Sequence, residues 1–447
     1  MVKRWINAPL VAVVAGSLVG ATVAPLGAAA ATTSGSRATA ASSTAAQAKA
    51  ARSKVDQQRW TTTRDFARGR HEGTAPWRGG RLTMAEPVGT TRYKDPFGGG
   101  TKTWDYARWT SPSHHVGFGA TELVSSWNAD TPRGTWLQVE MRGHVTHGSS
   151  GQKSLTKWYV MGRWAADDTD IHRTSVPGQK DDDGNISIDT FVAASGVHLR
   201  DYQLRVTLYR ASGGHARPSV RQVGAMASYV PERTTVPASP LGGAEGTELK
   251  VPRYSQDIHE GQYPQYDGGG EAWCSPTSTS MVVGYWGRGP SKKDMSWVDP
   301  SYADPQVDYA ARNTYDYNYE GAGNWPFNTA YAARFGLDGF VTRLRSLTEL
   351  EQFIKLGIPV VTSQSFKASE LPGAGYSTDG HLMVIIGFTK KGDVIANDPA
   401  SPTDSAVRHV YPRADFENVW QRSSSSGGVV YVITPRGHRL PRHVPGV

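Results

Sequence analysis

The residue with the greatest chemical potential in this sequence is a single cysteine. Cys274 is the only cysteine among 447 residues, so no disulfide can form within the chain. Pro276 suits the first turn of a helix, and Met281, Val282 and Tyr285 then follow at helical spacing. A thiol just before a helix N-terminus is stabilised as the thiolate, which is its nucleophilic form. This pattern predicts a nucleophile, against the alternative of an inert buried residue.

The region around the cysteine, residues 249–435, has the pattern of a mixed helix and strand domain. Thr348 and Glu351 have the spacing of a capping box, which predicts a helix that ends at Gly357. Apolar runs predict strands over residues 358–362, 382–388, 394–397 and 429–434. Helices that precede an antiparallel sheet indicate an α+β domain.

Four short motifs in this region carry a resemblance to a known family. In chain order they are Tyr254-Ser255-Gln256, Trp273-Cys274-Ser275-Pro276-Thr277-Ser278, Asp379-Gly380-His381-Leu382-Met383-Val384-Ile385-Ile386-Gly387-Phe388 and Asn397-Asp398-Pro399. In this order they resemble the papain-like cysteine peptidases related to the double-glycine-leader peptidases, the peptidase family C39-like group. That family usually has Gly after the cysteine, where this chain has Ser275.

The resemblance implies a role for each of four residues. Cys274 would be the nucleophile, and His381 the general base and acid. Asp398 would orient the imidazole, and Gln256 would donate to the oxyanion together with the Cys274 backbone N–H. An imidazolium partner stabilises a thiolate, and a tetrahedral oxyanion needs preorganised donors, so these roles agree with the chemistry. The same chemistry needs no metal and no organic cofactor.

The orienting group has two further candidates. Asn397 precedes Asp398 and points to the opposite face of the predicted strand, and Asp379 lies two residues before His381. Because an amide carbonyl can also orient a histidine, we rank Asp398 first and Asn397 second.

The N-terminal part of the chain, residues 58–230, has the pattern of an all-β, sandwich-like domain. Apolar and polar residues alternate over residues 136–142 and 202–209, and turn signals separate many short segments of this kind. Asp183-Gly184 has the composition of a tight turn. Eight of the 14 tryptophans lie here. Such rings either fill a core or stack on sugars, and we expect most of them to be core.

The remaining segments are expected to direct export of the chain or to connect its domains. Lys3-Arg4, an apolar stretch and a run of small residues predict a cleaved signal peptide over residues 1–31, with an uncleaved anchor as the alternative. An Ala/Ser/Thr-rich flexible segment is expected at 32–57, a Pro/Gly-rich linker at 231–248 and a tail at 436–447. No second apolar run has spanning length, so no integral membrane domain is expected.

Together these patterns predict a multidomain, secreted protein: an all-β sandwich-like domain followed by an α+β papain-like cysteine peptidase domain. The formal charge of +8 is scattered and no recognition motif accompanies it, so nucleic acid is not an expected partner. Expected substrates are peptide or isopeptide bonds, including those of a cell wall, with glycan or peptidoglycan contact through the N-terminal domain. The alternatives are an acyltransferase that uses the same thioester, and a catalytically inactive wall-binding protein.

Overall fold

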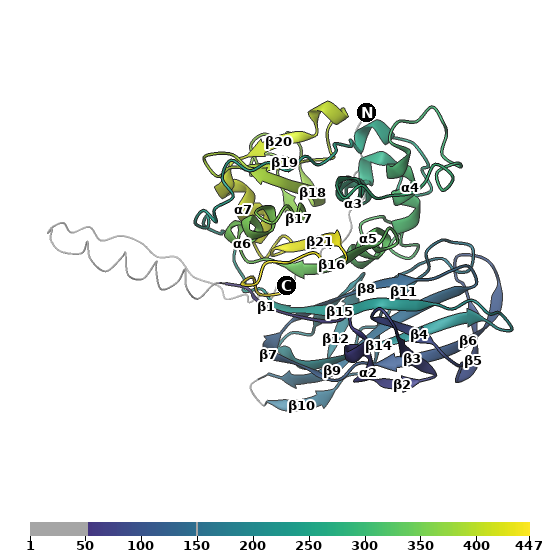
Figure 1. The fold of residues 1–447 in the computed structure, drawn as a ribbon. Helices are drawn as coiled ribbons and strands as arrows, with labels where there is room; N and C mark the ends of the chain where they lie inside the picture. The colour runs from purple at the N-terminus through teal and green to yellow at the C-terminus, as the bar shows by residue number, and fades with distance from the viewer. Residues whose placement is uncertain (1–51, 149–150) are drawn as a thin grey trace, which may run out of the picture. The chain divides into compact units, whose positions relative to one another are not determined.

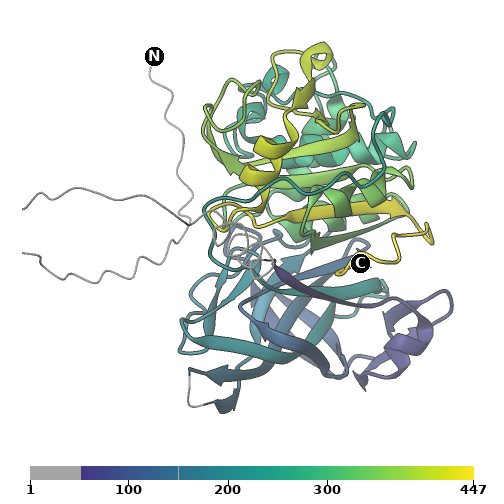
Figure 2. The same ribbon diagram turned by 90° about the vertical axis from the view of Figure 1, so that its left-hand side faces the viewer.

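The computed structural model describes residues 52–148 and 151–447, so the predicted signal peptide and most of the predicted flexible segment lie outside the described residues. Residues 53–447 form one compact unit. Figures 1 and 2 show a β-rich N-terminal region, coloured purple to teal, and an α+β C-terminal region, coloured green to yellow. The predicted multidomain fold is therefore confirmed.

Two antiparallel sheets make up the N-terminal region. One contains seven strands in the order β12-β13-β8-β15-β4-β3, with β1 paired to β15. The other contains eight, in the order β10-β9-β14-β6-β2, with β11 on β9, β5 on β6 and β7 on β14. The elements are β1 (Lys54–Trp60), α2 (Thr63–Ala67), β2 (Arg70–Glu72), β3 (Thr74–Trp77), β4 (Arg81–Met84), β5 (Gly89–Lys94), β6 (Thr101–Thr110), β7 (His114–Ala120), β8 (Glu122–Asp130), β9 (Thr135–His147), β10 (Gln152–Leu155), β11 (Tyr159–Trp164), β12 (Gly184–Ser187), β13 (Thr190–Ala193), β14 (Val197–Ala211) and β15 (Ser219–Tyr229).

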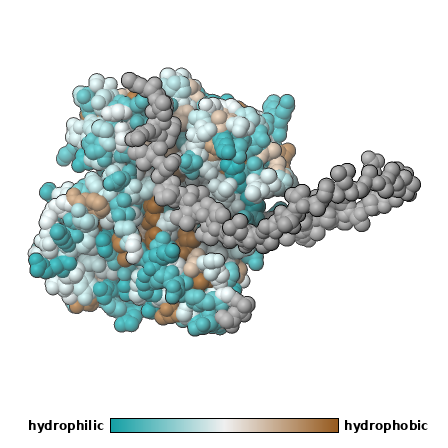
Figure 3. Space-filling view, turned by 180° about the vertical axis from the view of Figure 1, so that it is seen from behind, coloured by the Kyte–Doolittle hydropathy of each residue, from teal (hydrophilic) through white to brown (hydrophobic). Residues whose placement is uncertain are grey.

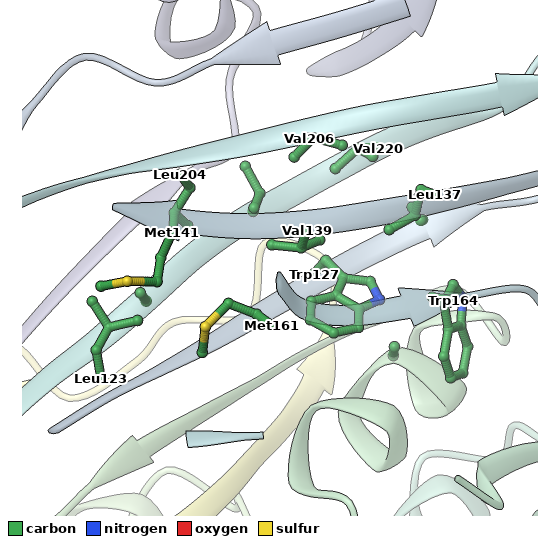
Figure 4. Close-up of a cluster of buried hydrophobic side chains, with 14 of the residues drawn as sticks. Leu123, Trp127, Leu137, Val139, Met141, Met161, Trp164, Leu204, Val206 and Val220 are labelled. Atoms are coloured by element: carbon green, nitrogen blue, oxygen red, sulfur yellow. The ribbon is translucent and has the colours of Figure 1, made fainter. Parts of the chain in front are cut away.

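The alternation seen in the sequence produces the core of this region, because successive strand residues face opposite sides of a sheet. Leu137, Val139 and Met141 of β9 are buried with Leu204 and Val206 of β14, as the close-up in Figure 4 shows. The strands predicted over residues 136–142 and 202–209 are thus both present, inside the longer strands β9 and β14.

Most tryptophans of the N-terminal region are core residues, as expected. Six of the eight are buried: Trp60, Trp104, Trp109, Trp127, Trp136 and Trp164. Trp77 is exposed, and Trp158 is half-buried beneath the guanidinium groups of Arg142 and Arg205. These last two rings are the ones that are not fully buried.

The C-terminal region is built on one antiparallel six-stranded sheet in the order β16-β21-β17-β18-β19-β20. Its elements are α3 (Cys274–Tyr285), α4 (Pro305–Thr314), α5 (Trp325–Ala333), β16 (Leu337–Arg343), α6 (Leu347–Ile354), β17 (Val360–Phe366), β18 (Thr378–Phe388), β19 (Val394–Asn397), β20 (Arg408–Tyr411), α7 (Arg413–Gln421) and β21 (Val429–Pro435). Short 3-10 helices lie at Asp257–His259, Gly270–Ala272 and Asp404–Ala406.

Both faces of this sheet are covered, which explains its continuous apolar runs. Val360 and Met383 belong to the cluster that packs on α6 and α7, whereas their neighbours Val361 and Val384 belong to the cluster that packs on α3. Figure 1 shows α6 and α7 on one side of the sheet and α3 and α5 on the other. Helix α3, which begins at the cysteine, is therefore held against the sheet along its length.

Two local predictions were wrong by a few residues. Helix α6 begins at Leu347, because the Ser346 hydroxyl accepts a hydrogen bond from the Glu349 N–H at 3.2 Å and caps the helix two residues earlier than expected. The tight turn near Asp183 lies instead between β12 and β13, where Ile188 adopts a left-handed conformation. Asp183-Gly184 leads into β12 rather than forming its hairpin.

The two regions share a buried interface at β16, the edge strand of the six-stranded sheet. The Asn128 side chain of β8 donates to the Gly339 carbonyl at 2.7 Å and accepts from the Gly339 N–H at 3.1 Å. The Ser126 hydroxyl accepts from the Val341 N–H at 2.9 Å. An uncovered edge strand presents unpaired backbone groups. The N-terminal region therefore satisfies this edge with its own side chains.

The segment between the regions also lies against the C-terminal region. Its backbone N–H groups donate to side chains of α6 and α7: Val236 to Asn418 at 2.8 Å, and Gly242 to Glu351 at 2.8 Å. In the space-filling view of Figure 3, hydrophilic residues make up most of the visible surface and hydrophobic ones occupy smaller areas. Among the described residues, none of the helices is long and apolar enough to cross a membrane.

Candidate active site

Cys274 is the first residue of α3. Trp273 occupies the N-cap position without a side-chain hydrogen bond, so the first backbone N–H groups of the helix have no side-chain cap. The thiol is half-buried at this end of the helix. The thiol therefore lies beside the positive end of the helix dipole.

His381 lies on β18 and is buried between two partners. Its Nε2 atom lies 2.7 Å from Asp398 Oδ1, and the Cys274 thiol is the second group that raises the pKa of the ring. Because Nε2 is engaged by the carboxylate, Nδ1 is the ring nitrogen left for the sulfur. Burial alone would lower the pKa of His381, but the Asp398 carboxylate and the Cys274 thiolate outweigh it and raise the pKa to about 10. The imidazolium is thus the favoured form at neutral pH.

Asp398 follows β19 directly and is fully buried. Besides His381 it accepts hydrogen bonds from the Tyr376 hydroxyl at 2.8 Å, the Tyr411 hydroxyl at 2.6 Å and the Ala400 N–H at 3.1 Å. Burial favours the protonated acid, yet His381 and the two phenols hold the pKa of Asp398 below its ordinary value. The carboxylate is therefore charged and fixed in orientation.

The two other candidates for the orienting group lie elsewhere. The Asn397 amide donates to the Pro252 carbonyl at 3.1 Å and lies close to that of Val251, so it fastens the chain segment that precedes the site. Asp379 is exposed on the first part of β18. Of the three candidates, Asp398 is the one in contact with His381.

Gln256 lies between the chain that precedes the cysteine and the chain that follows Asp398. Its side-chain amide donates to the Glu271 carbonyl at 2.7 Å, and its backbone N–H donates to the Pro399 carbonyl at 2.9 Å. The side chain is buried. One N–H of the amide is engaged by Glu271, and the second N–H is available as a donor.

Three tyrosines at the site were not predicted from the sequence. Tyr376 and Tyr411 bind Asp398, and the Tyr431 hydroxyl pairs with the Ser275 hydroxyl at 2.9 Å. Ser275, the departure from the family pattern, thus has a partner of its own on β21. Tyr431 lies in the predicted strand over 429–434, but no sequence signal pairs it with a residue 156 positions away.

The arrangement supports nucleophilic chemistry at a carbonyl. A thiol lies at a helix N-terminus beside an imidazolium, and a buried carboxylate holds that imidazolium in place. Within residues 52–148 and 151–447, no group of three or more His, Cys, Asp or Glu side chains is arranged to hold a metal ion.

Comparisons with known proteins divide the chain in the same place as its fold. Residues 56–228 match the family model described as the Peptidase C39 N-terminal domain, and residues 248–427 match the Peptidase C39 like family. No curated protein matches the chain. One solved structure, described as the structural basis for the promiscuous specificity of the carbohydrate-binding modules from the beta-sandwich super family, is 10% identical. The match covers 33% of this chain and 57% of that one, with a TM-score of 0.15 that is too low to indicate a shared fold.

Proposed function

The chain belongs to the C39-like peptidases, and from this premise we propose that it cleaves peptide bonds through Cys274, His381 and Asp398. The observation that carries the proposal is the 2.7 Å contact between the His381 imidazole and the buried Asp398 carboxylate, beside a thiol that raises the pKa of the same imidazole. The peptidase family supports a peptide substrate.

The proposed reaction proceeds in two steps. The Cys274 sulfur bonds to the carbonyl carbon, and the resulting oxyanion accepts hydrogen bonds from the Cys274 N–H and the Gln256 amide. When the C–N bond breaks, His381 gives its proton to the leaving amine and a thioester remains. Water then attacks the thioester and gives a proton to His381, which releases the acid and restores the thiolate–imidazolium pair.

The export of the protein is also proposed, on the strength of the Lys3-Arg4 start, the apolar stretch after it and the small residues near position 30. Cell-wall peptides are then accessible substrates. Contact with a glycan through the N-terminal region stays a prediction, for which Trp77 and Trp158 are the relevant side chains.

A peptide mixture in water labelled with heavy oxygen tests the reaction directly. Hydrolysis adds heavy oxygen to the new C-termini, as mass spectrometry would show, and a Cys274→Ala variant should give none. If an added amine acceptor takes up the acyl group instead, the protein is an acyltransferase. If neither product forms, the result favours the alternative of a catalytically inactive wall-binding protein.

Alkylation by iodoacetamide at several pH values tests the activated thiol separately. We expect Cys274 to react faster than free cysteine near neutral pH, and the advantage to disappear in a His381→Ala variant. His443→Ala is the matched control, because His443 is exposed in the C-terminal tail. Equal rates in the wild type and the His381 variant would refute the ion pair.

A further inference from the structure

The segment between α4 and α5, residues 315–324, lies next to the nucleophile. Tyr315 and Ala322 share a buried cluster with Trp273, the residue before Cys274. The Ala322 N–H donates to Asp267 at 3.2 Å, which ties the segment to the loop before the cysteine. The backbone around residue 319 is thus placed beside the start of α3.

The N-terminal region holds this segment from the opposite side. The backbone N–H and the hydroxyl of Ser175 donate to Asp316 Oδ1 at 2.9 and 3.1 Å. The Asn318 amide in turn donates to the Ser175 hydroxyl at 3.2 Å, and the Tyr317 N–H donates to the Arg173 carbonyl at 3.2 Å. These bonds join residues more than 140 positions apart in the sequence, so they fix the segment to another part of the fold.

Asp316 also binds the backbone next to it, so the same carboxylate connects Ser175 with the residues that follow. It is fully buried, and it also accepts from the Tyr319 N–H at 3.3 Å and the Asn324 amide at 2.9 Å. A second anchor from the N-terminal region lies at the other end of the segment, where the Asp189 carboxylate accepts from the Trp325 N–H at 2.7 Å. Both ends of the segment are therefore fixed by residues of the N-terminal region.

Tyr319 is the side chain that this anchorage presents to the site. Its ring packs over Gly321, where an added Cβ would lie 2.5 Å from the ring carbon Cε1, so the position requires glycine. The ring is half-buried, and the Cys274 thiolate is among the charges that raise the pKa of its hydroxyl after burial and Asp267.

The Tyr319 hydroxyl differs from the two other phenols near the thiol. Tyr376 is engaged with Asp398 and Tyr431 with Ser275. In the described part of the chain, the Tyr319 hydroxyl has no hydrogen-bond partner, and its oxygen is not among the buried unsatisfied atoms. A phenol beside a nucleophile with an accessible hydroxyl can donate to a bound peptide.

We propose that Tyr319 is a substrate-binding residue, and that Ser175 of the N-terminal region is a positioning residue that holds Tyr319 beside Cys274 through Asp316. The N-terminal region then forms one wall of the active site indirectly, as well as covering the edge of the sheet. The inference rests on the proposed peptidase function, since the ligand it assigns to Tyr319 is a peptide backbone.

Two alkylating probes distinguish this role from a general structural one. Iodoacetamide reports the thiolate alone, whereas a set of N-acyl dipeptidyl acyloxymethyl ketones with varied side chains must also bind as a peptide. The variants are Tyr319→Phe, Ser175→Ala and the control Ser126→Ala, which removes a hydroxyl from the same interface at β16 instead. Thermal unfolding of each variant checks that it folds.

We expect Tyr319→Phe and Ser175→Ala to raise the inhibition constant of the peptidyl ketones about threefold to tenfold, as for loss of one hydrogen bond. Their maximal inactivation rates and iodoacetamide rates should match the wild type, and Ser126→Ala should match it throughout. An unchanged constant in Tyr319→Phe, or an equal rise in Ser126→Ala, would overturn the proposal. So would a wild type that prefers none of the peptidyl ketones to iodoacetamide. If Cys274 of the wild type instead reacted with iodoacetamide no faster than free cysteine, the result would contradict the peptidase function itself.

Discussion

Asp398 and Asp316 are both fully buried, yet they differ in what surrounds them. Asp398 faces an imidazole and two phenols, and these partners hold its pKa below the ordinary value although burial favours the acid. Asp316 faces neutral donors, including Ser175 and Asn324. Those donors do not offset burial, so the pKa of Asp316 is raised.

The comparison shows how much an opposite charge adds to hydrogen bonds around a buried carboxylate. Hydroxyl and N–H donors lower its pKa and fix its orientation, but at Asp316 they do not offset burial, whereas at Asp398 the added cationic partner makes the ionised form the favoured one. Asp398 can therefore balance the His381 imidazolium, whereas Asp316 serves as a hub that joins two parts of the fold.

Asp398→Asn should have the largest effect on activity. We expect kcat/KM to fall about tenfold to a hundredfold, since a hydrogen bond to a charged group contributes about 1.5–3 kcal/mol. The wild type should keep its activity until the pH rises through the His381 pKa of about 10. The amide removes the charge that raises this pKa, so the alkaline limb of the pH–rate profile should move to lower pH.

Asp379→Asn is the matched control for that measurement, because Asp379 is exposed two residues before His381. Its alkaline limb should coincide with that of the wild type. A shift as large as that of Asp398→Asn would mean that the imidazolium responds to the general charge of the loop rather than to its contact with Asp398.

Asp316→Asn should instead reduce stability. The new NH₂ group would face the Asn324 amide, which cannot turn without losing its Oδ1 contact to the Phe327 N–H. Two opposed donors in a buried site cost about 1–3 kcal/mol of unfolding free energy. Chemical denaturation would measure the loss, with exposed Asp182→Asn as control. A drop in the iodoacetamide rate of Cys274 would contradict the assignment of Asp316 to the scaffold.

Asp189 allows the same distinction to be tested through pH. Burial raises its pKa to about 7, although the Trp325 N–H and the Thr190 hydroxyl bind it. The folded protein therefore holds this proton more tightly than the unfolded chain, and its contribution to stability declines as pH rises from about 4. The decline ends once the pH has passed the folded pKa.

The measurement is the unfolding free energy against pH for the wild type and Asp189→Asn. The amide keeps an oxygen for the Trp325 N–H but cannot titrate. The difference between the two curves should therefore slope by up to about 1.4 kcal/mol per pH unit inside this window and flatten above it. Parallel curves would show that Asp189 is not the titrating group.

The two carboxylates also differ in how far the sequence reveals them. Asp398 and His381 lie on neighbouring strands joined by a short turn, so motif order and strand pattern were enough to bring them together. Asp316 could not be predicted as a hub, because its partner Ser175 lies 141 residues away in a region expected to be a separate module. Long-range pairing of this kind leaves no local signal.

The helices missed by the sequence analysis did leave such a signal. Asn324 caps α5 and Pro326 lies in its first turn, and α4 begins at Pro305 directly after Asp304. A polar cap followed by proline is a start signal for a helix. Helix α5 shows no single apolar stripe at helical spacing, because it is buried nearly all round between the two regions and carries apolar residues on every side. Periodicity therefore failed where burial was most complete.

Tyr376→Phe and Tyr411→Phe should have the smallest effects on activity. Each variant tests a single hydrogen bond to Asp398. Each removes one donor but leaves the His381 contact, so we expect kcat/KM to fall only about twofold to tenfold, as for a single neutral hydrogen bond. With fewer donors the Asp398 pKa rises toward its ordinary value, and the acid limb of the pH–rate profile should move to higher pH. Tyr431→Phe is the control, because its hydroxyl binds Ser275 instead. The opposite outcome is that Tyr376→Phe or Tyr411→Phe leaves the acid limb in place while Tyr431→Phe moves it. The phenols would then act on the helix that carries the nucleophile rather than on the carboxylate. The charge of Asp398 would in that case depend on His381 alone.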